Sequence, residues 1–595
     1  PCPPKLQRRR ISLVRRSFSV GGLLLPRPPK LQRRRISLVR RSFSVGGFLL
    51  LFLNSCGDGK MHADLIVKNA KVYTVDGGFA VLESFAIRDG KFVAVGTDSS
   101  ISYLYEADSV YDAGGKIILP GFIDAHCHFL GYGLGLQQCN LVGTRSFDEV
   151  INRVKEFAKT AKSGWIVGRG WDQNDWTDKT FPDRRRLDSM FPDRPVILKR
   201  IDGHAALVNG AALKRSNIHY DTKITGGEIL VRREKNAPVE SDESLTGILI
   251  DNAVEQVEKV IPPPSAAQMR EALLTAQANC FAVGLTTVTD AGLMKDQIET
   301  IDALQKKGDL QMRVYAMLTD SLPNYKHYVA AGPYKTDYLN VRSFKFYADG
   351  ALGSRGACLL ENYSDQPGWK GFLLNTPKHF EEKMTLLAQK NFQVCTHAIG
   401  DSANRFILNL YAKILPDSIS KDRRWRIEHA QVVAEEDVML FGRSGIIPSV
   451  QPTHATSDMY WAEKRLGPER ARTAYAYKFL LGSAGMVALG TDFPVESINP
   501  MHTFYATVAR MDLRQFPPGG FQMENALSRW EALRGMTIWA AFANFEENEK
   551  GSIEAGKFAD FIILDKDPLA CPVNEIPGIL VLSTYVAGKN VFVKK

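Results

Sequence analysis

Eight apolar, strand-like runs recur through the middle of the chain, and helical stretches separate them. The runs cover residues 121–128, 284–291, 311–318, 343–350, 393–400, 425–431, 446–454 and 486–494. From the second run onward most spacings are near 30 residues, which is about the length of one strand–helix unit. Eight such units predict an α/β protein whose central domain is a (β/α)8 TIM barrel.

The two ends of the chain have a different pattern. Short alternating strands are expected at 63–75, 84–96 and 110–121, and again at 556–565 and 581–593. We therefore expect a small β-sandwich domain from residues 61–118 plus 550–595, around a barrel of residues 119–549. The first two barrel runs are about 155 residues apart, so an inserted α/β subdomain is expected at about 135–270, after the first barrel strand.

Residues 1–60 form a basic arm. The 20-residue segment PPKLQRRRISLVRRSFSVGG occurs unchanged at 3–22 and 28–47. It is too short and too charged to be a structural repeat, so we interpret it as a duplication or a translated upstream segment. The arm holds 14 of the 75 basic residues and one of the 65 acidic residues, which leaves the other 535 residues with a net charge of −3. That part of the chain has no charge excess that would bind nucleic acid.

The end of the arm is typical of an export signal. A basic stretch precedes the nine-residue apolar run Val45–Leu53, and Leu-Asn-Ser-Cys at 53–56 is similar to a lipobox. We expect an exported protein, either a lipoprotein attached to the membrane through a lipid on Cys56 or a periplasmic enzyme. One alternative is an organellar transit peptide. The other is an extension without function, and in that case the protein would be cytoplasmic.

The cysteines do not form a structural metal site. The eight cysteines include no C-x-x-C pair, so neither a disulfide framework nor a cysteine-rich zinc site is expected. Any metal must be held mainly by histidines and carboxylates.

The predicted carboxyl ends of the barrel strands carry the candidate site residues, among them four histidines and one aspartate that could bind a metal, because active sites of these barrels lie at that end. They are His126, His128, Lys345, His397, His429 and Asp492. The two histidines of the first strand are two residues apart and face one side, whereas Cys127 faces the other side. We therefore expect Cys127 to be a packing residue on the outer face of the barrel. A single histidine is commonly a core or surface residue, but this joint placement favours a metal centre with room for water.

Five motifs in order resemble the amidohydrolase superfamily, and most of all its YtcJ-like, N-substituted formamide deformylase-like branch. They are PGFIDAHCH, KFYADGALGSRGA, VCTHAIGD, RIEHAQ and GTDFPV. The resemblance covers residues 61–595. It implies that the six residues above hold one or two divalent ions, most simply Zn²⁺. It also implies that Lys345 is carboxylated where two ions are bound.

The implied reaction is hydrolysis of a non-peptide C–N bond in a small-molecule amide or formamide by metal-activated water. Asp492 would move the proton, and a histidine such as His454 would help to stabilise the oxyanion. One alternative is a deaminase of an aminated ring or amidine that uses the same site. A second alternative is a scaffold on the same fold that has lost catalysis. A homodimer is left open.

Further residues from the branch's patterns are candidates for substrate contact. They are Trp171, Asp172, His204, Arg355 and His454. The alternatives are helix caps, ion pairs and packing. Trp165, Trp171 and Trp176 in the insert suggest an apolar or aromatic substrate, although tryptophans in such a segment are more often packing residues.

Overall fold

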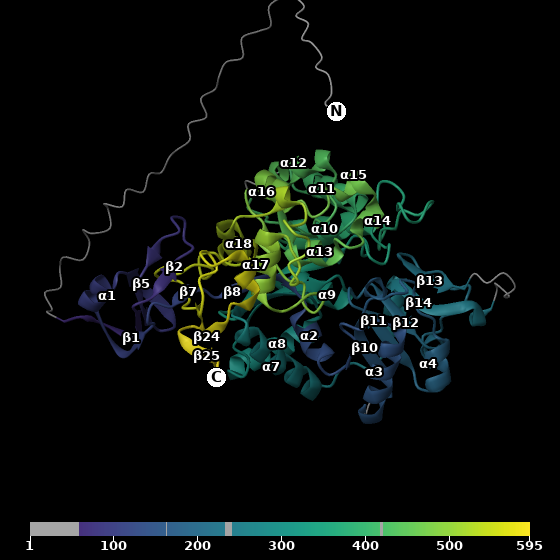
Figure 1. Cartoon of the computed structure of the whole chain (residues 1–595), viewed down its shortest axis with the longest axis horizontal. Coiled ribbons are helices and arrows are strands. Elements are labelled where there is room, and N and C mark those ends of the chain that lie inside the picture. The colour runs from purple at the N-terminus through teal and green to yellow at the C-terminus, as the bar shows by residue number, and fades with distance from the viewer. Residues whose placement is uncertain (1–58, 162–163, 233–240, 417–420) are drawn as a thin grey trace, which may run out of the picture. The chain divides into compact units, whose positions relative to one another are not determined.

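The computed structural model describes residues 59–161, 164–232, 241–416 and 421–595 (Figure 1). The predicted fold class is confirmed, because a parallel eight-stranded barrel is accompanied by additional sheets. The duplicated arm, the apolar run and Cys56 lie outside the described residues. Within the described ranges, no helix has the length and apolar character needed to cross a membrane.

All eight predicted barrel strands are present and run parallel. In spatial order they are β8 (Phe122–Cys127), β15 (Leu285–Leu293), β16 (Arg313–Thr319), β18 (Leu339–Tyr347), β19 (Gln393–Ala398), β20 (Arg426–His429), β21 (Ile447–Val450) and β22 (Ala488–Leu489). The short strand β17 (Tyr334–Lys335) pairs antiparallel with β18. Two hydrogen bonds join the two ends of the sheet, one from the Asp492 amide to the His126 carbonyl (2.8 Å) and one from the His128 amide to the Phe493 carbonyl (2.9 Å).

Helices follow the barrel strands and bury their apolar faces against them. They are α2 (Phe129–Gly135), α7 (Ala266–Ala282), α8 (Lys295–Lys307), α9 (Leu322–Ala331), α10 (Pro377–Gln389), α11 (Asp401–Ile414), α12 (Glu435–Ser444), α13 (Pro452–Asp458), α14 (Ala462–Leu466), α15 (Pro468–Ala471), α16 (Tyr477–Ala484), α17 (Pro500–Ala509), α18 (Arg529–Gly535) and α19 (Ile538–Ala543). Local sequence sets several of their ends. Ser265 and Gln268 form a capping box at the start of α7, and Gly308 ends α8 with a left-handed backbone.

The domain built from both ends of the chain contains two small sheets, and the second of them combines strands from the two ends. One contains β1 (Met61–Lys68), β4 (Ser84–Arg88), β5 (Lys91–Gly96) and β6 (Tyr105–Asp112), with α1 (Asp98–Leu104) before β6. The other contains β2 (Lys71–Tyr73), β3 (Val81–Leu82), β7 (Ile117–Pro120), β23 (Phe561–Leu564), β24 (Val581–Val586) and β25 (Lys589–Val593). Phe85, Phe92 and Phe561 belong to one buried cluster that joins the sheets. The alternating pattern at both ends therefore produces one shared core.

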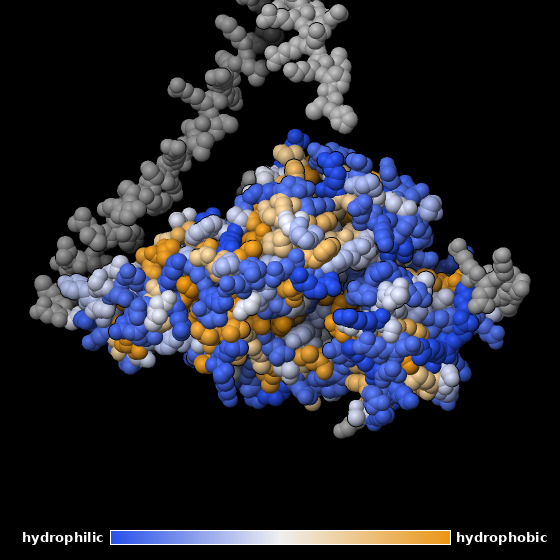
Figure 2. All heavy atoms as spheres, viewed as in Figure 1, coloured by the Kyte–Doolittle hydropathy of each residue, from blue (hydrophilic) through white to orange (hydrophobic). Residues whose placement is uncertain are grey.

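The insert after β8 is a mixed sheet with helices. Its strands are β9 (Cys139–Asn140), β10 (Ile166–Trp171), β11 (Val196–Arg200), β12 (Ala205–Val208), β14 (Leu245–Asp251) and β13 (Gly227–Val231), in spatial order. Its helices are α3 (Phe147–Thr160), α4 (Arg185–Met190), α5 (Gly210–Arg215) and α6 (Asn252–Glu258). Figure 1 shows these elements gathered together, and the sheet has its own apolar clusters. On the face drawn in Figure 2 the surface is mainly hydrophilic, with apolar areas between.

Candidate metal centre

Three residues at the ends of three barrel strands bring potential ligand atoms together. Ligand atoms of His126, His429 and Asp492 all lie within 4.8 Å of one another, and all three residues are buried. His128, at the start of α2, adds its Nε2 atom 3.2 Å from Asp492 Oδ1. The strand ends after β8, β20 and β22 therefore meet at one point, as the barrel predicts.

His397 and Lys345 extend this cluster along β19 and β18. The rings of His397 and His429 are 4.6 Å apart between centroids. The buried Nζ atom of Lys345 lies 3.3 Å from His126 Nε2. The structure thus brings all six predicted ligand residues into one continuous cluster.

The charge states of this cluster suit a cation. Burial, followed by the nearby Lys345, lowers the pKa of His126 to about 4, and burial lowers the pKa values of His397 and His429 well below the usual range. Burial opposes ionisation of Asp492, but the hydrogen bond from His128 and the adjacent histidines hold its pKa well below the usual value. At neutral pH the cluster therefore offers neutral imidazoles and a carboxylate, which are the forms that bind metal.

Unpartnered atoms in the cluster fit a metal ion. Among the described residues, His429 Nδ1 and His454 Nε2 are buried without a hydrogen-bond partner. Such atoms are costly to bury unless a ligand satisfies them. Histidine and carboxylate donors at this spacing are those that Zn²⁺ and similar divalent ions take in hydrolytic sites.

Strained backbone and a close approach shape the site. His429 and Asp492 have φ angles of +73° and +60°, which residues other than glycine rarely adopt and which cost about 1–3 kcal/mol each. At Gly490, just before Asp492, an added Cβ would lie 2.5 Å from the His126 amide nitrogen. The glycine in the GTDFPV motif therefore lets the eighth strand close against the first.

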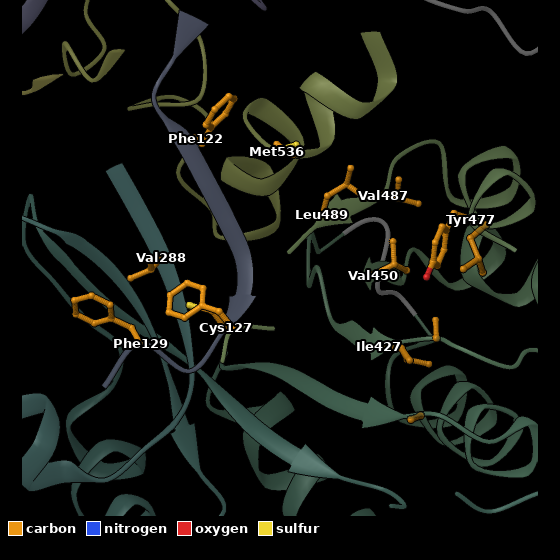
Figure 3. Packing of buried hydrophobic residues seen from close by; sticks show 14 of the residues in the cluster. Phe122, Cys127, Phe129, Val288, Ile427, Val450, Tyr477, Val487, Leu489 and Met536 are labelled. Atoms are coloured by element: carbon orange, nitrogen blue, oxygen red, sulfur yellow. The ribbon is translucent and has the colours of Figure 1, made fainter. Parts of the chain in front are cut away.

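A β-bulge in β8 decides which way its histidines face. Val288 pairs with Asp124 and Asp290 pairs with Cys127, so three residue steps on β8 match two on β15. The extra residue turns Cys127 toward the apolar cluster that holds Phe129 (Figure 3). His126 faces the other way, toward His429 and Asp492. The prediction that Cys127 packs away from the two histidines is confirmed.

A Cys127→Ala variant is expected to bind metal normally. The Cys127 thiol is buried among apolar residues and contacts the Thr289 carbonyl at 3.4 Å, so its loss should lower the free energy of unfolding by about 1 kcal/mol. Elemental analysis and thermal unfolding measure the two effects. Loss of metal from this variant would contradict the arrangement.

Glu428 was missed in the sequence, although it lies beside His429 in RIEHAQ. Its Oε2 atom is 2.6 Å from His126 Nδ1, and Arg426 binds the same carboxylate from Nε at 2.7 Å. Burial opposes ionisation of Glu428, yet Arg426 and His126 hold its pKa well below the usual value. A carboxylate on Nδ1 fixes the ring so that Nε2 faces the site. The alternating Arg-Ile-Glu pattern, two charges on one face of a predicted buried strand, was the available signal.

Two other predicted histidines lie beside the cluster. His454, in α13 after β21, places Nε2 at 3.8 Å from Asp492 Oδ2, and its ring stacks on His429 at 5.8 Å between centroids. His204, from the turn between β11 and β12 of the insert, lies 5.0 Å from His397 between ring centroids. Both histidines therefore lie next to the candidate metal ligands.

The remaining candidates have structural partners. The Trp171 ring is buried in an apolar cluster of the insert, and its indole N–H donates to the Leu198 carbonyl at 2.7 Å. Asp172 pairs with the buried Arg200 at 2.5 Å, and Arg355 binds Asp365 at 2.9 Å. Packing and ion pairing, the alternatives for these residues, account for their positions.

Comparisons with known proteins agree with the geometry. Residues 109–592 match the family model described as "Amidohydrolase family". Protein LONG AFTER FAR-RED 3 of Arabidopsis thaliana is 33% identical over 89% of this chain and 92% of its own length. A protein of Bacillus subtilis (strain 168) named "Putative amidohydrolase YtcJ" is 30% identical over 86% of this chain and 96% of its own length. The N-substituted formamide deformylase of Arthrobacter pascens is 24% identical over 88% and 97%.

A solved structure is also similar. An uncharacterized metal-dependent hydrolase from Pyrococcus furiosus aligns with a TM-score of 0.66 at 28% identity, over 85% of this chain and 99% of that one. The resemblance predicted from the five motifs is confirmed.

Proposed function

Because this chain belongs to the amidohydrolase family, we propose that it hydrolyses a non-peptide C–N bond, of amide or formamide type, in a small molecule. Two relatives support this proposal, since their names are "N-substituted formamide deformylase" and "Putative amidohydrolase YtcJ". The observation that carries the proposal is the convergence of neutral histidines and one carboxylate at the mouth of the barrel.

We propose that the ligands are His126, His128, Lys345, His397, His429 and Asp492. They would hold one or two ions, most simply Zn²⁺, since imidazole and carboxylate donors suit it. Such an ion supplies Lewis acidity that activates water and polarises the substrate's carbonyl. Burial lowers the pKa of Lys345 to about 8, which favours the neutral amine that carboxylation needs.

Asp492 and His454 are the residues proposed to act on the reacting groups. Asp492 is ionised, so its carboxylate can accept the proton of the attacking water and pass it to the leaving nitrogen. His454 has an unpartnered Nε2 atom 3.8 Å from Asp492 Oδ2. We propose that this atom hydrogen-bonds the substrate oxygen where negative charge develops.

Metal analysis of the purified protein and a substrate screen test the proposal together. We expect about one or two metal ions per chain, and hydrolysis of formamides or N-acyl amines that a chelator abolishes. Carboxylate release supports amide hydrolysis, whereas ammonia release from an aminated ring or amidine would support the deaminase alternative. Absence of bound metal together with absence of turnover would favour the inactive scaffold.

A further inference from the structure

The insert delivers a second polar pair to the site, and the residue behind His204 has no role in the chemistry above. His204 Nδ1 lies 2.6 Å from Asp251 Oδ1. The Asp251 side chain is fully buried, whereas the His204 side chain remains 16% exposed. One edge of the His204 ring, with Nδ1, therefore contacts a buried carboxylate, and part of the ring remains accessible.

The backbone of the insert holds this pair in register. Ala205 pairs with Ile250 in the antiparallel ladder of β12 and β14, and the Asp251 amide donates to the His204 carbonyl at 2.8 Å. Asp251 adopts φ +49° and ψ −123°, a conformation that residues other than glycine rarely adopt. The sheet thus holds Asp251 at the last position of β14 and His204 directly before β12.

The Asp251 carboxylate packs closely against two glycines of the barrel. An added Cβ at either Gly350 or Gly356 would lie 2.3 Å from Asp251 Oδ2. These glycines belong to the turn that follows β18, which closes through a hydrogen bond from the Gly356 amide to the Ala351 carbonyl at 3.0 Å. Two glycines of the KFYADGALGSRGA motif are therefore explained by the carboxylate of a residue about 100 positions earlier.

The His204 ring also lies next to one of the candidate metal ligands, His397. The His204 ring lies 5.0 Å from that of His397 and 6.3 Å from that of Tyr347, between centroids. Because Nδ1 is engaged with Asp251, the opposite edge of the ring, with Nε2, is the edge left for a substrate.

We propose that Asp251 is a positioning residue that fixes His204 beside His397, and that the glycine turn at 350–356 seats its carboxylate against the barrel. This inference rests on the proposed function, because His204 is useful there only if a substrate binds at the metal cluster. It also makes the insert a part of the catalytic apparatus, since the barrel alone lacks this histidine.

Two variants disturb the pair by different routes. Asp251→Asn removes the charge with little change of shape, and Gly356→Ala pushes the carboxylate away without altering either residue of the pair. Each is expected to lower kcat/KM by about 10- to 100-fold, since misplacing a contact group by about 1 Å is costly. His204→Asn should produce a similar loss, and combining it with Asp251→Asn should add little to it.

Controls separate positioning from general damage. Gly482→Ala, at a glycine with open space around it, should leave kcat/KM unchanged. Metal content should be normal in every variant. If Asp251→Asn and Gly356→Ala retain full kcat/KM while His204→Asn loses it, the positioning role is refuted. If they lose metal or unfold, the pair is structural and the proposal is equally refuted.

A spectroscopic readout keeps this test independent of the proposed reaction. In protein labelled with ¹⁵N-histidine, His204 Nδ1 should carry its proton in the wild type and change its ¹⁵N shift in Asp251→Asn. An unchanged ¹⁵N shift of Nδ1 in that variant would overturn the inference. If no amide is hydrolysed by the wild type but this shift changes, the proposed function fails and the positioning of His204 stands.

Discussion

An Asp492→Asn variant is expected to keep most of its metal and to lose about 10²- to 10⁴-fold in kcat, the contribution of a general acid–base group. Asparagine retains an oxygen at the ligand position, and five other candidate ligands remain. Asparagine also tolerates the left-handed backbone at this position, where φ is +60°. What it loses is the ability to accept a proton. Elemental analysis and steady-state kinetics on the best substrate of the screen measure the two effects.

Glu496→Gln is the matched control for that variant. Glu496 lies beside the same histidine, with Oε1 4.0 Å from His454 Nε2, and it accepts a hydrogen bond from Ser457. Removing its charge should change kcat by only a few fold, because no proton transfer is assigned to it. Full activity in Asp492→Asn would show that the proton acceptor is another group.

Replacing Glu428 with glutamine is expected to weaken metal binding by about 10- to 100-fold, because the residue that orients a metal-binding histidine sets its geometry and basicity. The same change leaves the buried Arg426 without its partner carboxylate. Breaking a buried ion pair from one side typically costs about 3–5 kcal/mol in the free energy of unfolding. Competition with a chromogenic chelator and chemical denaturation measure the two effects.

Glu546→Gln separates these effects. Glu546 and Lys550 form another buried pair at 3.1 Å, close to Arg313 at the start of β16 and so at the opposite end of the barrel. Loss of the Glu546 charge should lower the free energy of unfolding and leave metal affinity unchanged. Equal metal affinity in Glu428→Gln and the wild type would show that Glu428 only neutralises Arg426.

Several features could be predicted from the sequence because they depend on local order. Strand–helix units near 30 residues long predict a barrel, and the barrel places strand ends at one mouth. His397 and His429 could therefore be assigned to one site although they are 32 positions apart. Apolar periodicity also predicted the two-ended β domain and the insert, since those patterns record which face is buried.

Other features depend on contacts that no local pattern contains. Glu428 meets His126 across 302 positions, and Asp251 meets the glycine turn only because the insert packs on the barrel. The sequence could not show whether Trp171 contacts a substrate or packs in the core of the insert, because the same residue type serves both roles.

The sequence by itself determined the barrel, its order of strands and the set of residues at its mouth. The tertiary structure alone decided the direction in which His126 and His128 face at the end of β8. If side chains alternated strictly along β8, His126 would lie on the outer face of the barrel together with Phe122. The bulge opposite Val288 and Asp290 moves His126 to the inner face instead. A bulge arises from pairing with the neighbouring strand, which begins more than 150 residues later in the chain. The direction in which the first two histidines point is therefore a property of the fold.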